Sequence, residues 1–365
     1  MKKNVIIFMP SIEDGGVEKN LYEVSNYLVK NNISLEIITC NKNMSFKFSK
    51  DIKFIGTKNS YWNNRSRYIK YIICLLILFL TLIKRKEKTL VFAFQANIYA
   101  VILAKILNVK IITRSNSAPP GWSQNAIKNF IYKFFIKFAN DVMVNSFEFK
   151  KIFEKKFNIK VKCIYNPFNK NFVLKKIKIK KKITFFEKGY LNIISVGRLT
   201  DQKDHLTLLR SIKELDSNFK VKVIIIGKGS TKDILKRYII KNNLQNKIKL
   251  FGYTNNPFPF IQKANMVVLT SKFEGLPNIL LEAQFLRKYI ISTNCPTGPK
   301  EILLNSKAGD LINIGDFKKL SHLIKNYSNN KNSIIKKINT GYKKFYRFDY
   351  MLNCKKYLNF IKNNY

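Results

Sequence analysis

The stretch from Ser271 to Ala283 holds the densest set of residues that could do chemistry, because two carboxylates stand eight positions apart in it. Glu274 falls in a predicted loop and Glu282 inside the predicted helix that follows. One carboxylate can therefore meet a ligand from the end of the helix and the other from its side. Pro277 suits the first turn of this helix, because its missing N–H would be unbonded there. The backbone N–H groups near Leu276 and Asn278 would lie at the positive end of the helix dipole, which favours a phosphate.

A second set of candidate residues follows the predicted strand 191–196. Arg198 and Lys203 stand five positions apart in the loop after this strand. They could hold two phosphates, because a guanidinium binds through a planar fork and an ammonium as a point charge. A loop with ordinary solvated charges is the alternative. His205 begins the next helical run, where we expect it to pack or to cap rather than to react.

Glycines follow three of the predicted strands, where a missing Cβ lets the backbone approach a ligand closely. They are Gly15, Gly16, Gly197, Gly227 and Gly229. The full dinucleotide fingerprint G-x-G-x-x-G and the P-loop motif G-x-x-x-x-G-K-[ST] are both missing from the sequence. A structural turn explains each of these glycines as well as a ligand does.

Short apolar or β-branched runs alternate with amphipathic stretches, a pattern typical of parallel sheets covered by helices on both faces. The first series of predicted strands is 5–9, 34–39, 90–93, 110–113, 141–145 and 161–165. The second series is 191–196, 220–226, 247–251, 266–269 and 289–292. Helices are predicted between them, for example at 17–30 and 125–138. Ligands of such sheets bind at the carboxyl ends of the strands, where the loops described above stand.

The chain has 365 residues, about twice the usual size of a domain, and a lysine-rich break separates the two series of strands. We predict an α/β fold with two doubly wound domains. The N-terminal Rossmann-like domain covers 1–168 and a basic connector with at most one edge strand covers 169–190. The C-terminal Rossmann-like domain covers 191–345, and the tail 346–365 has apolar spacing suited to a helix.

The chain is strongly basic, with 67 Lys and Arg residues against 22 Asp and Glu, a formal charge of +45. This charge points to a nucleic acid, an anionic membrane surface or a phosphorylated ligand, or to a compositional bias toward surface lysine. The 46% of hydrophobic residues exclude a disordered basic tail. Five scattered cysteines without a C-x-x-C, and two histidines, argue against a disulfide framework or a zinc site and fit a reducing cytoplasm.

Two apolar runs raise the question of a membrane. Residues 5–9 are too few for the apolar core of a signal peptide, and we interpret them as a strand. Residues 71–83 are continuously apolar between basic flanks, but they fall short of the about 20 residues that span a bilayer. This run predicts either a buried helix or a helix in the membrane interface with its basic flanks on anionic headgroups.

The order of these motifs resembles that of the retaining glycosyltransferases of family 4, which belong to the glycosyl transferases group 1 and have the GT-B fold. The resemblance spans nearly the whole chain, and its most specific parts are the stretch from Glu274 to Glu282 and the loop with Arg198 and Lys203. The other matching segments are GGVE at 15–18, GRL at 197–199, GKG at 227–229, NCPTGP at 294–299 with Glu301, and FDYM at 348–351.

The resemblance implies a nucleotide-sugar donor, expected to be UDP-linked, held mostly by the C-terminal domain in a cleft between the two domains. The catalytic residues would be Glu274, facing the transferred sugar, and Arg198 and Lys203, which would stabilise the leaving diphosphate. Glu282 would bond the ribose hydroxyls. The other expected donor-binding residues are Gly15, Gly16, Gly197, Gly227, Gly229, Gly275, Leu276, Pro277 and Asn278. Neither a metal ion nor a cofactor is required.

The resemblance also implies transfer of a hexose or an N-acetylhexosamine to a cell-surface polysaccharide or a lipid-linked oligosaccharide. The protein would be cytoplasmic and peripheral on the inner face of the cell membrane, with an anionic membrane surface as a partner. The tail helix would pack back on the N-terminal domain. Several branches of the family place a histidine of that domain near the sugar. No histidine precedes His205 here, and the contact could fall to Gln95 or to the segment Arg114–Asn116.

Two alternatives belong to different functional classes. A nicotinamide-dependent oxidoreductase fits a Rossmann-like sheet, but the first-loop fingerprint is missing and the paired glutamates have no role in it. A basic nucleic-acid-binding protein fits the charge, but the sequence holds neither a recognition module nor an aromatic–basic stacking strip. We therefore expect no nucleic-acid partner.

Overall fold

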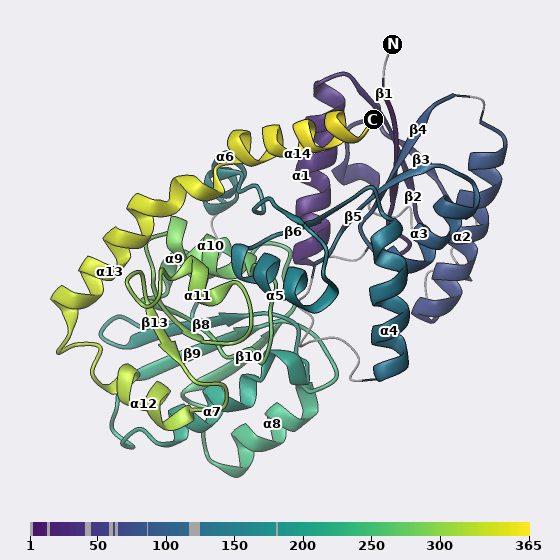
Figure 1. Cartoon of the computed structure of the whole chain (residues 1–365). Helices are drawn as coiled ribbons and strands as arrows, with labels where there is room; N and C mark the ends of the chain where they lie inside the picture. The colour runs from purple at the N-terminus through teal and green to yellow at the C-terminus, as the bar shows by residue number, and fades with distance from the viewer. Residues whose placement is uncertain are drawn as a thin grey trace. The chain divides into compact units, whose positions relative to one another are not determined.

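The chain forms two compact units in the computed structural model, which describes residues 3–12, 15–40, 45–57, 61–62, 65–85, 87–116, 125–179 and 182–365. Unit 1 comprises Met1–Pro167 together with Tyr350–Tyr365, and unit 2 comprises Phe168–Asp349. Each unit has its own parallel sheet and its own hydrophobic core (Figure 1).

Unit 1 is built on a sheet of seven strands among its described residues, in the order β3-β2-β1-β4-β5-β6-β7. Every paired strand of this sheet runs parallel to its neighbour. The strands are β1 (Lys3–Phe8), β2 (Ile33–Ile38), β3 (Lys53–Ile55), β4 (Thr89–Ala93), β5 (Lys110–Arg114), β6 (Asp141–Val144) and β7 (Lys162–Cys163). A parallel sheet needs a crossover between successive strands, and the helices of this unit supply it.

Helices cover both faces of this sheet. They are α1 (Gly16–Lys30), α2 (Arg67–Ile83), α3 (Asn97–Ile106), α4 (Ala126–Phe135), α5 (Phe147–Phe157) and α14 (Tyr350–Asn364). In β1, Val5 and Ile7 enter a core cluster with α1, whereas Ile6 and Phe8 enter another with α2 and α3. Successive side chains of a strand point to opposite faces, so both faces are covered and the doubly wound arrangement is confirmed.

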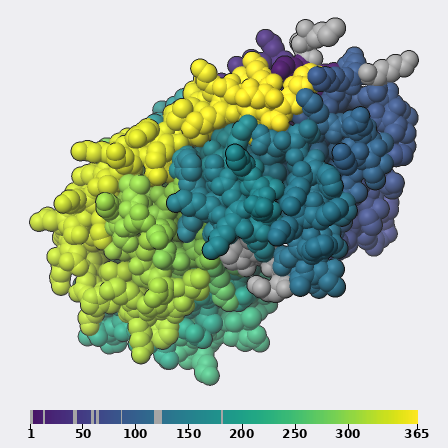
Figure 2. All heavy atoms as spheres, viewed as in Figure 1, coloured from purple at the N-terminus to yellow at the C-terminus, as the bar shows by residue number. Residues whose placement is uncertain are grey.

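The C-terminal helix α14 belongs to unit 1 although unit 2 precedes it in the chain. It lies beside α1 (Figure 1), and its Tyr357 and Ile361 are buried in the cluster that α1 and β1 form. Tyr350 Oη donates to the Glu23 carbonyl of α1 at 3.4 Å. In the space-filling view the yellow C-terminal end of the chain rests against the spheres of unit 1 (Figure 2). The expected return of the tail helix to the N-terminal domain is confirmed.

Unit 2 is built on a parallel sheet of six strands among its described residues, in the order β10-β9-β8-β11-β12-β13. The strands are β8 (Leu191–Val196), β9 (Val221–Ile226), β10 (Ile248–Gly252), β11 (Met266–Leu269), β12 (Tyr289–Thr293) and β13 (Asp310–Ile312). The helices are α6 (Lys170–Ile177), α7 (His205–Lys213), α8 (Lys232–Lys241), α9 (Phe258–Lys263), α10 (Asn278–Phe285), α11 (Pro299–Ile302), α12 (Phe317–Lys325) and α13 (Lys331–Lys343). Because β8 and β11 are neighbours, the loops that follow them leave the sheet side by side.

Three short elements differ from the sequence prediction. The strands β3 and β13 have three residues each, too few to show a period of two, and the prediction lacks them. The helix α6 lies inside the region 169–190, where the prediction has a basic connector and at most one edge strand. Asn169 fixes its start, because the side chain accepts the Phe172 N–H at 3.0 Å and caps the first turn.

The apolar run 71–83 lies in α2, and the two faces of this helix differ. Cys74, Leu78 and Leu82 are buried, whereas Ile72 and Leu76 are exposed. The prediction of a buried helix therefore holds for one face only. In the part of the chain that the structure describes, no helix is both long and apolar enough to span a bilayer.

Candidate functional site

The predicted donor-binding residues of unit 2 lie in loops at the carboxyl edge of its sheet, except Asn278 and Glu282, which lie in α10. Gly197 follows β8, Gly227 follows β9, and Glu274 is in the loop after β11. The Gly197 N–H donates to Ile226 O at 3.0 Å, and the Gly227 N–H donates to Gly252 O at 2.9 Å. Because β8 lies between β9 and β11, these loops are neighbours and bring the candidates into one region.

An ion pair joins two of the main candidates, Lys203 and Glu274. Lys203 Nζ lies 2.5 Å from Glu274 Oε1, and Ser271 Oγ donates to the same oxygen at 2.6 Å. Only 14% of the Lys203 side chain and 8% of the Glu274 side chain are exposed. Each charge therefore depends on the other for compensation, since water reaches neither of them freely. An ammonium held in this way can still turn one of its three donors to an incoming phosphate.

Contacts between two loops hold this pair in place. The aliphatic chain of Lys203 lies 3.5 Å from the point where a Cβ on Gly197 would stand. Gln202 Nε2 donates to Phe273 O at 2.9 Å, and the Lys272 N–H donates to Gln202 O at 2.8 Å. These bonds tie the loop after β8 to the loop after β11, so the lysine and the glutamate are positioned by backbone as well as by charge.

Arg198 lies apart from the ion pair. Its side chain is exposed, and Nη2 is 3.4 Å from Oε1 of Gln202. The structure therefore brings Lys203 and Glu274 together and leaves the guanidinium of Arg198 at the rim of the same loop.

Backbone packing requires the two glycines of the loop after β9. A Cβ on Gly227 would stand 1.8 Å from Gly197 O, and a Cβ on Gly229 would stand 2.2 Å from Leu199 O. The Leu199 N–H also donates to Lys228 O at 2.9 Å. The turn alternative has direct support at these glycines, while their contact with a nucleotide stays a prediction.

The stretch with the two glutamates has the predicted arrangement, with one adjustment. The helix α10 begins at Asn278, and Pro277 is its cap residue rather than part of the first turn. Glu274 precedes this helix and Glu282 lies within it. Of the predicted site residues in the stretch, Asn278 is partly exposed and the others are buried, namely Glu274, Gly275, Leu276, Pro277 and Glu282.

Thr297 and Ser271 are functional candidates that the sequence analysis does not single out. Thr297 Oγ1 donates to Glu274 O at 2.7 Å, so it fixes the backbone of that glutamate as Ser271 fixes its carboxylate. Gly298 has φ +86°, and a Cβ there would stand 2.2 Å from Gly275 O. Thr297 lies inside the segment 294–299 that matches the family, and this match is the sequence feature that could have identified it as a candidate.

Two titratable neighbours of the ion pair stay neutral at neutral pH. Burial, and then the charge of Lys203, lower the pKa of His205 to about 4, and its Nδ1 lies 3.2 Å from Ser195 Oγ. The prediction that His205 has a packing role is confirmed, since it is buried at the start of α7. Burial, and then the carboxylate of Glu274, raise the pKa of the Cys295 thiol to about 12.

In unit 1, Gly15 and Gly16 lie at the start of α1. Gly15 is the cap residue with an extended backbone, and Gly16 is the first helical residue. A Cβ on Gly15 would stand 2.7 Å from Oε2 of Glu18, so glycine leaves room for this buried carboxylate. Their contact with a donor stays a prediction.

The candidates for the family's histidine have partners within unit 1. Gln95 Oε1 accepts the Ser11 N–H at 3.1 Å. Arg114 is 1% exposed, and its guanidinium donates to Asn166 Oδ1 at 2.9 Å and to Asn116 Oδ1. Arg114 is thus a buried cation at the carboxyl end of β5. These contacts favour neither Gln95 nor the segment Arg114–Asn116 as the replacement for the histidine.

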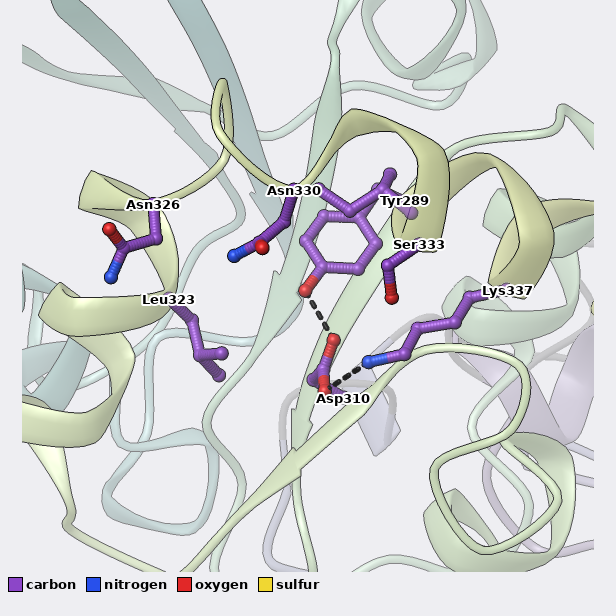
Figure 3. A pocket seen from close by; sticks show the side chains of 8 residues that line it. Tyr289, Asp310, Leu323, Asn326, Asn330, Ser333 and Lys337 are labelled. Atoms are coloured by element: carbon purple, nitrogen blue, oxygen red, sulfur yellow. Dashed lines mark hydrogen bonds and ion pairs between the residues drawn. The ribbon is translucent and has the colours of Figure 1, made fainter.

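A pocket of about 180 Å³ lies between β12, β13, α12 and α13, away from these loops (Figure 3). Tyr289 and Asp310, the first residues of β12 and β13, place it at the amino edge of the sheet. Tyr289 Oη donates to Asp310, which also pairs with Lys337 at 2.5 Å. The pocket contains none of the predicted site residues. Within the described ranges, no group of three or more His, Cys, Asp and Glu residues could hold a metal ion.

A family model and curated relatives match this chain. Residues 176–344 match the model described as "Glycosyl transferases group 1", so the match contains the ion pair and α10. The chain is 25% identical over 339 residues to a Campylobacter jejuni N-acetylgalactosamine-N,N'-diacetylbacillosaminyl-diphospho-undecaprenol 4-alpha-N-acetylgalactosaminyltransferase, covering 84% of this chain and 85% of the relative. It is 39% identical over 178 residues to an uncharacterized glycosyltransferase of Methanocaldococcus jannaschii, where the match spans 47% of this chain and 44% of the relative.

Solved structures share the fold over the whole chain. Anabaena HepE in complex with UDP has a TM-score of 0.79 at 16% identity and covers 99% of this chain and 100% of its own. Sucrose-phosphate synthase from Thermosynechococcus elongatus has a TM-score of 0.82 at 11% identity. The match covers 99% of this chain and 98% of the synthase. None of the proteins named here is an oxidoreductase or a nucleic-acid-binding protein. Residues 176–344 therefore carry the likeness to the glycosyl transferases group 1, and the two α/β units have the GT-B fold.

Proposed function

We propose that this protein is a glycosyltransferase that moves a hexose or an N-acetylhexosamine from a UDP-linked donor to a saccharide acceptor with retention of the anomeric configuration. The observation that carries the proposal is the Lys203–Glu274 pair at the carboxyl edge of unit 2, inside the segment that matches the family model. The likeness to HepE, whose structure holds UDP, supports the nucleotide. The name of the Campylobacter jejuni relative supports an N-acetylhexosamine.

In the proposed reaction the bond between the anomeric carbon and the diphosphate oxygen breaks, and its electron pair leaves with the diphosphate. The oxygen of an acceptor hydroxyl forms the new bond to the anomeric carbon on the same face, and the proton of that hydroxyl passes to the leaving diphosphate. Lys203 and Arg198 stabilise the charge that develops on this leaving group. Glu274 holds the ammonium of Lys203 in place before the donor arrives, so little reorganisation is needed when the bond breaks. Arg198, at the exposed rim of the loop, adds a planar fork for the phosphate oxygens.

Glu274 faces the transferred sugar in this proposal. Among the described residues, the donors Lys203 Nζ and Ser271 Oγ both bind its Oε1. We propose that Oε2 accepts a hydrogen bond from a sugar hydroxyl, while Ser271 keeps the carboxylate oriented. Glu282 accepts hydrogen bonds from the ribose hydroxyls in this proposal. The other proposed donor contacts are those of Gly15, Gly16, Gly197, Gly227, Gly229, Gly275, Leu276, Pro277 and Asn278.

The proposed acceptor is a cell-surface polysaccharide or a lipid-linked oligosaccharide on the inner face of the cell membrane. The protein would then be cytoplasmic and peripheral to that membrane. Two relatives in Campylobacter jejuni support this choice, since both names describe sugars carried on diphospho-undecaprenol or PP-undecaprenol. Each relative is 25% identical to this chain.

UDP should stabilise the protein against heat, whereas NAD should not. Binding at a hundredfold excess over Kd adds about 2.7 kcal/mol to the free energy of unfolding. Scanning calorimetry of the full chain with each nucleotide measures the shift. Lys203→Ala should lose most of the shift in melting temperature that UDP causes. Lys272→Ala should keep this shift, because it removes a neighbouring lysine that is paired with Asp201 at the surface. Stabilisation by NAD and not by UDP would favour an oxidoreductase instead.

Removal of divalent cations should leave the transfer rate unchanged. The proposal assigns the stabilisation of the leaving diphosphate to Lys203 and Arg198, which perform the electrostatic task that a metal ion performs in other enzymes. Release of UDP, measured with EDTA and with added Mg²⁺, checks this. A loss of activity in EDTA that Mg²⁺ restores would contradict the assignment.

A further inference from the structure

The helix α2 exposes an apolar face of a kind that surface helices normally make polar. This face, the α2 stripe, consists of Tyr68, Ile72, Leu76, Leu80 and Ile83, whose side chains are each between 50% and 65% exposed. At 3.6 residues per turn these positions fall within an arc of about 120° along the whole helix. A single exposed leucine needs no explanation, but a continuous apolar stripe does.

The opposite face of α2 is fixed in the core of unit 1. Cys74, Leu78 and Leu82 are buried in the cluster that contains Ile6 and Phe8 of β1. The stripe therefore cannot turn inward without pulling these residues out of the core. The exposed position is a property of the fold.

Neighbouring helices of unit 1 also expose large apolar side chains. The helix α3 contacts both α2 and α4. It exposes Ile106, and α4 exposes Ile127, Phe130 and Phe134. None of the residues of α4 is buried, and lysines alternate with its apolar side chains. A surface of large apolar residues mixed with lysine fits a layer that is apolar beneath and anionic above.

The charges around the α2 stripe decide between its possible occupants. Arg65 and Arg67 stand at one end, and the exposed Lys84 stands at the other, where Arg85 is paired with Glu36. A second copy of the chain would bring cations against cations whichever way the two helices ran, and like charges in an interface disfavour it. An anionic lipid surface complements both ends at once, and the formal charge of +45 acts in the same direction.

We infer that α2 docks unit 1 on an anionic lipid bilayer, with the helix axis in the plane of the interface and the stripe toward the acyl chains. Its 17 residues are too few to span the bilayer, and its other face stays on the sheet. The inference rests on the proposed function only in giving a reason for docking, which is an acceptor carried on the membrane.

Sedimentation with vesicles of phosphatidylcholine and phosphatidylglycerol tests the inference on the full chain. Ile72→Gln combined with Leu76→Gln should weaken binding at least about tenfold, because two apolar side chains no longer gain from leaving water. The matched control is Ile234→Gln combined with Ile240→Gln. It removes two comparably exposed apolar side chains from α8 of unit 2 and should bind like the parent protein.

A second pair of variants tests the charge. Arg67→Gln combined with Lys84→Gln should weaken binding to these vesicles roughly 30-fold, since each cation near an anionic surface contributes about 1 kcal/mol. Lys318→Gln combined with Lys319→Gln lowers the net charge equally on α12 of unit 2 and should leave binding unchanged. Vesicles of phosphatidylcholine alone should bind the parent protein far more weakly.

Parent-like vesicle binding by the α2 variants would overturn the inference. A parent protein that is a dimer in sedimentation velocity, with α2 variants that are monomers and still bind vesicles, would also overturn it. A second copy of the chain would then cover the α2 stripe. The nucleotide gives a separate readout, since α2 lies in unit 1 and the ion pair in unit 2. If UDP fails to stabilise the parent protein, the proposed function fails while the vesicle result still stands.

Discussion

Lys203→Ala should lower kcat for sugar transfer by about 10²–10³-fold, as the loss of one preorganised group that stabilises developing charge does in other enzymes. In this chain the ammonium is held by Glu274 at 2.5 Å in a largely buried position. Water cannot replace it there with the same geometry. Transfer of a radiolabelled sugar to a saccharide acceptor, followed at saturating donor, measures the loss.

The chain offers a matched control in the same pair of loops. Lys272 Nζ pairs with Asp201 at 2.7 Å, but 39% of the lysine side chain and 85% of the aspartate are exposed. Exposed pairs of this kind contribute about 0–1 kcal/mol. Lys272→Ala should therefore keep both activity and stability. Equal losses in the two alanine variants would mean that the loops, and not the buried ammonium, are what the reaction needs.

A double variant separates catalysis from stability. Lys203→Ala also leaves the carboxylate of Glu274 without its main compensating charge, which destabilises the fold. Lys203→Met combined with Glu274→Gln removes both charges together and should recover most of the lost melting temperature. It should remain inactive, because neither the phosphate nor the sugar contact is restored. Recovery of transfer in the double variant would show that the pair is structural.

Much of the fold could be predicted because its central strands are long, apolar and bounded by loop residues. The predicted bounds 191–196 and 266–269 coincide with β8 and β11. Prediction failed where the local signal was short or contradictory. The three residues of β13 cannot show a period, and the lysine-rich α6 depends on its Asn169 cap and on packing of Val173.

The candidate site residues could be selected from the sequence, but the contact between two of them could not be predicted. Lys203 and Glu274 are 71 positions apart, and we expected one on the phosphate and the other on the sugar. Their contact follows from the placement of β8 beside β11, and parallel alternation alone does not specify which strands become neighbours. Gly227 shows the same limit, because its close approach to Gly197 depends on the distance between two loops.

Gly227→Ala should destabilise unit 2 by about 3 kcal/mol, at the upper end of the usual cost of overpacking. The new Cβ would stand 1.8 Å from Gly197 O and 2.9 Å from the carbonyl carbon, and both atoms are backbone. Relief requires the ends of β8 and β9 to separate, which strains the bond from Gly197 N–H to Ile226 O. Urea unfolding followed by circular dichroism measures the loss. Both tryptophans precede residue 168, so their fluorescence serves as an internal reference for unit 1.

Gly252→Ala separates the steric clash from ordinary glycine strain at the same edge of the sheet. Gly252 has φ +86°, but no described atom lies within 4 Å of its added Cβ. Its cost should be about 1–2 kcal/mol from the left-handed backbone alone. The two variants should also differ in nucleotide binding, because the chain of Lys203 lies over Gly197 and any shift of that loop moves the ammonium. UDP should therefore stabilise Gly252→Ala as it does the parent protein and Gly227→Ala much less. If both variants unfold together and bind UDP alike, the approach of the two loops does not position the site.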